Sequence, residues 1–384
     1  MDFSLSDEQV LLRDSAERFV REEYKLDARR RLVAAGDPIS AEHWRQYAEL
    51  GWLALPIPED VGGLGGSFVD LMVLMVALGS GCVLEPYIPN LVLCAPILDR
   101  SPARSLLGAV ADGSLRLALA HDEAGDRFNL AGPRTTQATA AGDGFLLTGA
   151  KTLVLGGPSA DRFIVSATIT GEPACSLFLV HRDQVEDQVE QALSRYPLID
   201  GTWAADLSLS VEVSADALIV RSDRATALLD EAIDRATLAY LAEAVGSMET
   251  CLEICSAYLK IRKQFGQAIG KFQALQHILA EMFVEAQEAR SILYQALSQI
   301  GADASLRRRA VSAAKIVIGQ ASQIISRQGV QLHGGYGVTD EYPISHHFKR
   351  LMVIEKLFGD IEHHTTRFAG TAPGLQAPDS SPAA

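Results

Sequence analysis

The sequence lacks the features that mark secreted, membrane-spanning or metal-stapled proteins. Its 384 residues include only five cysteines, an odd number with no Cys-x-x-Cys pair, so we expect reduced, buried thiols and neither disulfides nor zinc. The longest apolar runs, such as residues 71–78, are far shorter than the roughly 18 residues that a membrane-spanning helix needs. The N-terminus has no basic segment followed by an apolar one, so the expected location is cytoplasmic.

Basic residues are also scarce relative to acidic ones. The 34 lysines and arginines against 48 acidic residues give a net charge of −14, which repels both a nucleic-acid backbone and an anionic membrane surface. We therefore expect no nucleic-acid or membrane partner. With 48% hydrophobic and 21% charged residues, the chain has the composition of a globular protein, and its length predicts two to three domains.

The hydrophobic pattern predicts three successive regions. Up to about residue 115 the pattern is helical, beginning where Ser6 and Gln9 have the spacing of a capping box. Residues 116–221 contain short apolar runs bounded by turn residues, and Leu207–Val213 alternates apolar with polar residues as a strand does. Residues 222–370 return to helical spacing. The predicted fold class is α+β, mainly α.

The shorter elements expected within these regions can be named from the same patterns. The predicted strands include 145–147, 153–155 and 163–165, and the predicted C-terminal helices lie near 225–261, 273–300, 305–330 and 345–368. The tail at 371–384 is rich in proline, alanine and serine and is predicted to be disordered.

Asp234 is the one acid in an apolar stripe that runs from residue 234 to residue 259 in steps of four and three. Two interpretations are open from spacing alone. The carboxyl group is either desolvated, with a raised pKa suited to proton abstraction, or it emerges into water beside Arg235.

Two polar motifs follow helices in the C-terminal region. Arg262–Gly266, with Phe272 and Gln273 shortly after, offers a cation, aromatic rings and amides that suit a phosphate and a flat ring, although arginine also occurs at ordinary helix ends. Gln331 precedes the glycine-rich turn at 334–337, where bare backbone can approach a ligand or simply end a helix. No strand precedes this turn, which excludes a Rossmann fingerprint.

The pairs His346-His347 and His363-His364 raise the question of a metal site. Adjacent histidines on a helix point about 100° apart, so each pair supplies at most one ligand to a common ion. We expect no metal.

Taken in order, the motifs resemble those of the acyl-CoA dehydrogenase family. The matching segments are Pro58-Glu59 with the glycines of 62–66, then Arg262–Gly266, then Gln331 with Gly334, Gly335 and Gly337. The resemblance covers the chain up to about residue 370. It implies a helical N-terminal domain at 1–115, a central β-barrel-like domain at 116–221 and a C-terminal four-helix bundle at 222–370. The segment 339–360 resembles the branch that includes the small subunit of pimeloyl-CoA dehydrogenase.

The resemblance also implies a cofactor and an assembly. It places Arg262 on the pyrophosphate of FAD and assigns Phe265, Phe272 and Gln273 to the adenine end. Gln331, Gly334 and Gly335 would reach the same pyrophosphate from across a subunit interface, so a homo-oligomer or a hetero-oligomer with a homologous chain is expected. The family reaction removes a proton from the α-carbon of an acyl-CoA while the β-hydrogen leaves as hydride to the flavin. Electron-transfer flavoprotein is the implied electron acceptor.

Two departures from the family pattern concern the chemistry. The usual base is a glutamate before a glycine, and Phe358-Gly359 stands in that place, where a phenyl ring accepts no proton. Some relatives carry the base before an arginine early in the long helix, which corresponds here to Asp234-Arg235. We therefore predict Asp234 as the base and Arg235 as a substrate residue. Aspartate is shorter than glutamate by about 1.5 Å, so its backbone has to lie closer to the substrate.

The second departure lies near the expected flavin ring. The family's Thr-Glu-Pro turn is reduced to His121–Asp126, and Leu153–Leu155 replaces an aromatic-Ile-Thr step, which removes a hydroxyl hydrogen bond. The sequence thus predicts an FAD-dependent acyl-CoA dehydrogenase. It leaves open a catalytically silent subunit that lends Arg262 and Gln331 to an active homologue, and a flavoprotein oxidase on the same fold.

Overall fold

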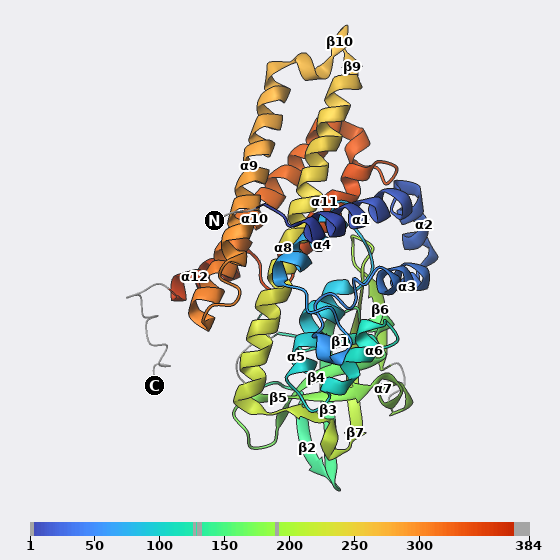
Figure 1. Ribbon diagram of the computed structural model, residues 1–384, viewed down its shortest axis with the longest axis vertical. Helices are drawn as coiled ribbons and strands as arrows, with labels where there is room; N and C mark the ends of the chain where they lie inside the picture. Colours follow the sequence, from blue (N-terminus) through green and yellow to red (C-terminus); the bar gives the residue numbers. More distant parts are fainter. Residues whose placement is uncertain (1–3, 126–127, 129–132, 189–191, 372–384) are drawn as a thin grey trace. The chain divides into compact units, whose positions relative to one another are not determined.

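The structure is a computed structural model that describes residues 4–125, 128, 133–188 and 192–371 (Figure 1). The chain divides into two compact units, Met1–Glu243 and Ala244–Ala384, which are described separately below. Apart from Thr371, the tail predicted to be disordered lies outside the described residues. Among the described helices, none combines the length and the apolarity that crossing a membrane requires.

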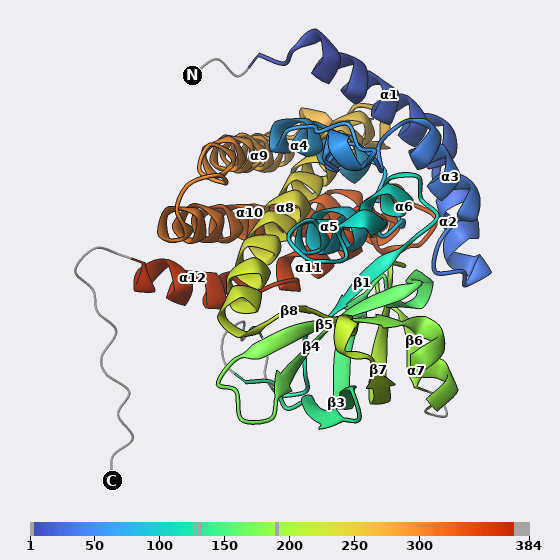
Figure 2. The ribbon, with the colours of Figure 1, turned by 60° about the horizontal axis from the view of Figure 1, so that its bottom comes forward.

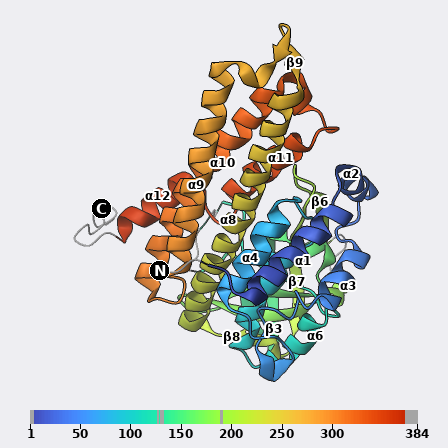
Figure 3. The same ribbon diagram turned by 45° about the horizontal axis from the view of Figure 1, so that its top comes forward.

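The first unit begins with helices joined by short turns. The main ones are α1 (Asp7–Glu23), α2 (Leu26–Ala35), α3 (Ala41–Glu49), α4 (Phe68–Gly79), α5 (Ala95–Asp99) and α6 (Leu107–Ala111). The predicted capping box is confirmed, because the Ser6 side chain accepts a bond from Gln9 N while the Gln9 side chain accepts one from Ser6 N. Helix α1 lies beside α4 (Figure 3).

A mixed sheet follows in the same unit (Figure 2). Its strands are β1 (Leu117–Ala120), β2 (Gln137–Ala141), β3 (Gly144–Leu155), β4 (Arg162–Ile169), β5 (Cys175–His181), β6 (Leu193–Pro197), β7 (Trp203–Val213) and β8 (Leu218–Val220), with helix α7 (Arg182–Gln188) after β5. The strand order is β6-β7-β3-β2-β4-β5-β8, and β1 pairs in parallel with β4. The predicted alternation is confirmed in β7, where Leu207, Leu209, Val211 and Val213 are buried.

The two short strands predicted at 145–147 and 153–155 are in fact parts of the single strand β3. Its pairing with β7 changes register between Lys151 and Val154, and Leu153 has a φ of 52°. This is an irregularity of the β-bulge type, which bends a strand without ending it. Thr148, Lys151 and Thr152 interrupt the apolar pattern, which explains why the sequence predicted two strands.

The second unit consists mainly of long helices. Helix α8 (Ser222–Ile261) begins in the first unit and ends in the second, and a hairpin of β9 (Lys263–Gln264) and β10 (Gln267–Ala268) follows it. Then come α9 (Gln273–Leu297), α10 (Ala304–His333), the 3-10 segment η7 (Gly334–Val338), α11 (Pro343–Lys356) and α12 (Ile361–Gly370).

The single helix predicted near 345–368 is wrong, because the chain turns between α11 and α12. Phe358 has a φ of 55° and Gly359 a φ of 112°, neither of which continues a helix. The buried Lys315 ammonium donates to the carbonyl oxygens of Ile354 and Leu357, at 2.7 Å each. These tertiary bonds satisfy the last carbonyls of α11 and so stabilise its end.

All five cysteines lie in the described part of the chain, and each is buried, as predicted.

Replacing Gly79 tests the packing of the first unit. A Cβ at this last residue of α4 would lie 2.1 Å from the carbonyl oxygen of Glu243, so backbone has to move. We expect Gly79→Ala to lower the free energy of unfolding by about 1–3 kcal/mol, despite the better helix propensity of alanine. Gly301→Ala is the control, since no atom lies within 4 Å of its Cβ position. Equal urea midpoints for the two variants would contradict the prediction.

Candidate functional site

The exposed tip of the second unit carries the first polar motif (Figure 1). Arg262 follows the last residue of α8 and is exposed. Phe265 and Gly266 form the two-residue turn between β9 and β10, with φ values of 51° and 78°. Turns with two positive φ angles favour asparagine and glycine, so phenylalanine is strained in this position.

The ring of Phe265 has little contact with the rest of the described protein. The residue is 91% exposed, and its ring meets that of Phe272 edge-on, with centroids 6.1 Å apart. Phe272 is the N-cap residue of α9, and the exposed Gln273 begins this helix. A strained residue that holds a large ring in solvent points to a function in binding.

The second motif lies at the end of α10. Gln331 is exposed, and Gly334 leaves the helix with a φ of 60°. Both Gly334 and Gly335 are exposed, and no atom lies within 4 Å of the position a Cβ would take on either residue. The backbone here is therefore open to close approach by a ligand.

A stack of aromatic rings brings the two motifs to the same end of the helices. Tyr258, one turn before Arg262, lies against His333, the last residue of α10, with ring centroids 4.3 Å apart. His333 also meets Tyr342, with centroids 4.8 Å apart. The end of α8 is thus fixed beside the end of α10.

Asp234 lies in the half of α8 that belongs to the first unit. It is only 1% exposed, so the interpretation that this carboxyl group emerges into water is wrong. The neighbouring Arg235 binds Glu231, with Nη2 and Oε1 3.0 Å apart, and Glu231 also binds Arg100. That Asp234 acts as the base and that Arg235 contacts the substrate are both still predictions.

Phe358 occupies a rigid corner in the second unit. His364 Nε2 lies 3.1 Å from the Phe358 carbonyl oxygen, and a Cβ on Gly359 would lie 2.5 Å from the ring of His363. Together with the two bonds from Lys315, these contacts hold the backbone on both sides of the Phe358 side chain. Burial lowers the pKa of Lys315 to about 7, although Glu355 and Asp360 act against this shift.

The segments expected near the flavin ring contain a buried ion pair that the sequence analysis missed. Lys151 Nζ lies 2.6 Å from Glu123 Oε1, and the two side chains are 0% and 1% exposed. The ammonium also donates to Ser166 Oγ at 3.1 Å and to the His121 carbonyl oxygen at 3.3 Å. A lysine inside an apolar strand pattern was the available signal. Asp126, within the predicted turn, lies outside the described residues.

Glu123 is held in its charged form. Its carboxylate accepts bonds from the backbone N–H groups of Thr135 and Thr136 and from the Thr135 hydroxyl. Burial would raise the pKa of Glu123, but Lys151 and these bonds outweigh burial and hold that pKa well below its usual value. Burial lowers the pKa of Lys151 to about 8, against the opposing effect of Glu123.

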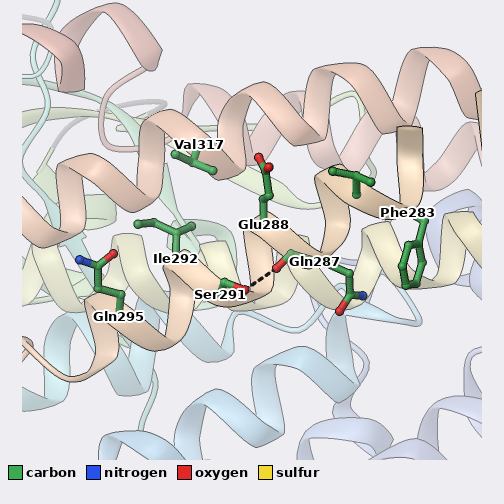
Figure 4. Close-up of a pocket in the computed structure, with 8 residues that line it drawn as sticks. Phe283, Gln287, Glu288, Ser291, Ile292, Gln295 and Val317 are labelled. Carbon is green, nitrogen blue, oxygen red and sulfur yellow. Dashed lines mark hydrogen bonds between the residues drawn. The ribbon is translucent and has the colours of Figure 1, made fainter. Parts of the chain in front are cut away.

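A separate groove runs along α9, next to α10 (Figure 4). Its apolar lining comes from Phe283, Val284, Ile292 and Val317, and Glu288 lies among them. None of the predicted site residues lines it.

The histidine pairs have other partners. His347 Nδ1 lies 2.8 Å from Ser247 Oγ, and His364 Nδ1 lies 3.2 Å from Ser312 Oγ. The residues that the structure describes contain no group of three potential metal ligands.

Comparisons with known proteins give the family. The description "Acyl-CoA dehydrogenase, N-terminal domain" matches residues 6–101, and "Acyl-CoA dehydrogenase, C-terminal domain" matches residues 226–371. The chain belongs to the acyl-CoA dehydrogenase family. The observed fold, with a helical N-terminal part, a central sheet and a helical C-terminal part, is the fold of this family, as predicted.

Individual relatives extend over nearly the whole chain. The short-chain specific acyl-CoA dehydrogenase of Clostridium acetobutylicum is 24% identical, covering 94% of this chain and 97% of its own. The ChsE4-ChsE5 complex from Mycobacterium tuberculosis contains a chain 26% identical, with a TM-score of 0.83 and coverage of 96% and 97%. The Tcur3481-Tcur3483 steroid ACAD matches at 29% identity, with a TM-score of 0.83 and coverage of 96% and 98%.

FAD is the cofactor of the acyl-CoA dehydrogenase family, and the exposed end of the second unit fits it. The Arg262 guanidinium can pair with a diphosphate, the open backbone at Gly334-Gly335 can approach that group, and the exposed Phe265 ring can cover an adenine. Near the expected flavin ring, the Leu153 N–H is already bonded to Asp206 Oδ1 at 3.0 Å.

Breaking the buried ion pair tests its contribution to stability. Lys151→Met leaves the Glu123 carboxylate buried without its ammonium partner, so we expect a loss of about 3–5 kcal/mol in the free energy of unfolding near neutral pH. Glu123 stabilises the fold above its usual pKa of 4.5, and this stabilisation is lost as the pH falls below that value. Urea titrations at several pH values measure both effects.

Lys349→Met is the matched control, because Lys349 pairs with Asp340 on the surface with side chains 39% and 53% exposed. This change should cost less than about 1 kcal/mol. If Lys151→Met costs no more than Lys349→Met, the internal ion pair is not the stabilising element described above.

Proposed function

We propose that this chain is an FAD-dependent acyl-CoA dehydrogenase that introduces an α,β double bond into an acyl-CoA thioester. Membership of the family supports the reaction class. The observation that carries the proposal is the meeting of the two motifs at one end of the second unit, where Arg262, Phe265 and Gly334-Gly335 are all exposed. Three chemically different groups there match the diphosphate and the adenine of one ligand.

The proposed reaction moves one proton and one hydride. The Asp234 carboxylate takes the proton from the α-carbon, the β-hydrogen leaves with its electron pair, and the carbon–carbon double bond forms between these two atoms. When bound, FAD supplies the hydride acceptor. Burial of Asp234 is compatible with this role, because a closed reaction site excludes water from the group that takes the proton.

The assembly and the electron acceptor belong to the same proposal. Exposed binding groups at Phe265 and Gln331 support completion of the FAD site by a second subunit, either another copy or a homologue. Electron-transfer flavoprotein is the proposed acceptor. The cytoplasmic location and the pimeloyl-CoA dehydrogenase small-subunit branch stay predictions from the sequence.

A second function is favoured by the corner at Phe358. Lys315 and His364 bind backbone carbonyl oxygens around Phe358, whose φ of 55° is rare for phenylalanine. The apolar side chain at this position accepts no proton. One similar structure is the ChsE4-ChsE5 complex, and the Tcur3481-Tcur3483 steroid ACAD likewise carries two component names. We therefore also consider a supporting subunit that contributes Arg262 and Gln331 to the FAD site of an active homologue.

The visible spectrum and the native mass of the purified chain separate these two functions. We expect a yellow oligomer with about one flavin per chain, whose flavin is bleached by an acyl-CoA. Arg262→Ala should lower FAD affinity at least tenfold through loss of a charge-assisted contact, while Arg327→Ala, another exposed arginine of the second unit, should not. A colourless chain that binds FAD only with a homologous partner would support the second function and overturn the first.

Asp234→Asn tests the base directly. Removing the proton acceptor should slow flavin bleaching about a hundredfold or more while FAD stays bound. Asp230→Asn is a matched control on the same helix, since Asp230 is also buried, at 5% exposed. Unchanged bleaching in Asp234→Asn would remove this residue from the mechanism.

A further inference from the structure

His333 closes helix α10 immediately before Gly334-Gly335, and it is 4% exposed. Its Nδ1 lies 2.7 Å from the carbonyl oxygen of Gly329. A carbonyl only accepts hydrogen bonds, so Nδ1 carries the proton and Nε2 of the neutral ring is an acceptor. Within the described residues this buried Nε2 has no hydrogen-bond partner.

The ring of His333 joins three segments of the second unit. It lies against Tyr258 of α8 at an interplanar angle of 36° and against Tyr342, the N-cap residue of α11, at 48°. Tyr342 in turn meets Tyr336 of η7, with centroids 5.2 Å apart. Each of these segments borders the exposed turn at Gly334-Gly335 or the end of α8 that precedes Arg262.

A proton on Nε2 would change this arrangement. The titratable and charged groups of the packed segments include Cys255, Tyr258 and Lys260 from α8, Tyr336 from η7, Asp340, Glu341 and Tyr342 before α11, and His346 and Lys349 from α11. The nearest rings are phenols, which are uncharged near neutral pH. Contact with their faces offsets only part of the cost of a buried imidazolium whose new N–H has no acceptor.

We propose that His333 is a positioning residue for the cofactor: its neutral ring holds the Gly334-Gly335 turn beside the end of α8, and its protonation releases that turn. The inference rests on the proposed FAD site. The chain should therefore lose FAD affinity in mild acid, and this loss depends on protonation of His333, which does not itself contact the cofactor.

The sign of the effect follows from burial. Burial lowers the pKa of His333, and the bond to Gly329 offsets only part of that shift. The folded arrangement therefore holds fully above the usual histidine pKa of 6.5 and weakens as the pH falls below it. Phenylalanine at this position keeps a stacking ring and cannot take a proton.

Equilibrium dialysis of the full chain against FAD, at about pH 7.5 and about pH 5.5, tests the proposal on either side of the usual histidine pKa. For the wild type we expect an affinity about five- to tenfold weaker at the lower pH, tenfold being the limit that one proton on a group with the usual histidine pKa of 6.5 sets between these two pH values. His333→Phe should bind FAD within about fivefold of the wild type at the higher pH and change less than about threefold between the two, since one protonation step is removed.

His277→Phe is the matched control, because His277 is an exposed histidine of α9 near the same motifs. It should follow the wild-type profile. Equal pH dependence in the wild type and His333→Phe would overturn the proposal, and so would loss of the effect in His277→Phe.

Hydrogen exchange of the backbone at 329–338 gives a readout that does not need FAD. In the wild type this segment should lose protection in mild acid, after correction for the intrinsic exchange rate, whereas His333→Phe should stay protected. If the chain takes up no FAD at about pH 7.5, the proposed function fails, while this measurement still decides the role of His333. Unchanged protection in the wild type would overturn the proposed release.

Discussion

The packing of Tyr258 against His333 is the contact that holds the ends of α8 and α10 together in the second unit. Arg262 and Gly334 are far apart in the sequence, and both are exposed. The contact between the half-buried Tyr258 and the buried His333 lies next to both segments and fixes the ends of the two helices beside each other. The side chain of Arg262 and the backbone of Gly334 can then remain exposed to solvent, while the Tyr258–His333 contact fixes the positions of the two segments.

In the first unit, a buried ion pair holds two segments together. Lys151 and Glu123 are buried together, and every donor of the ammonium has an acceptor in Glu123, Ser166 or the His121 carbonyl. The ion pair joins the segment that follows β1 to the middle of β3. These segments are therefore held in place by the protein's own hydrogen bonds and ion pair.

Much of this architecture was predictable from local signals. Three features depend on near neighbours in the chain: the Ser6 capping box, the alternation in β7 and the long helical stripes. The motif at Arg262 could also be recognised from the sequence, because its residues are contiguous. The burial of Asp234 was not predictable, since an acid at the end of an apolar stripe is equally compatible with solvent until the packing elements are known. The buried Lys151 was missed because a lone lysine in a strand usually faces water.

By itself, the sequence determined the order of helical, β-rich and helical regions, the helix starts and the family motifs, because periodicity and capping act over a few residues. Only the tertiary structure decided that β3 passes through a bulge as one strand and that the last helix breaks at Phe358-Gly359. Both outcomes involve partners far away in the chain. Strand β7 pairs with β3 on both sides of the bulge, where Asp206 accepts a bond from Leu153 N, and Lys315 donates to the carbonyl oxygens of Ile354 and Leu357 at the break. A periodic pattern carries no record of such partners, so the break and the bulge appear only when distant segments meet.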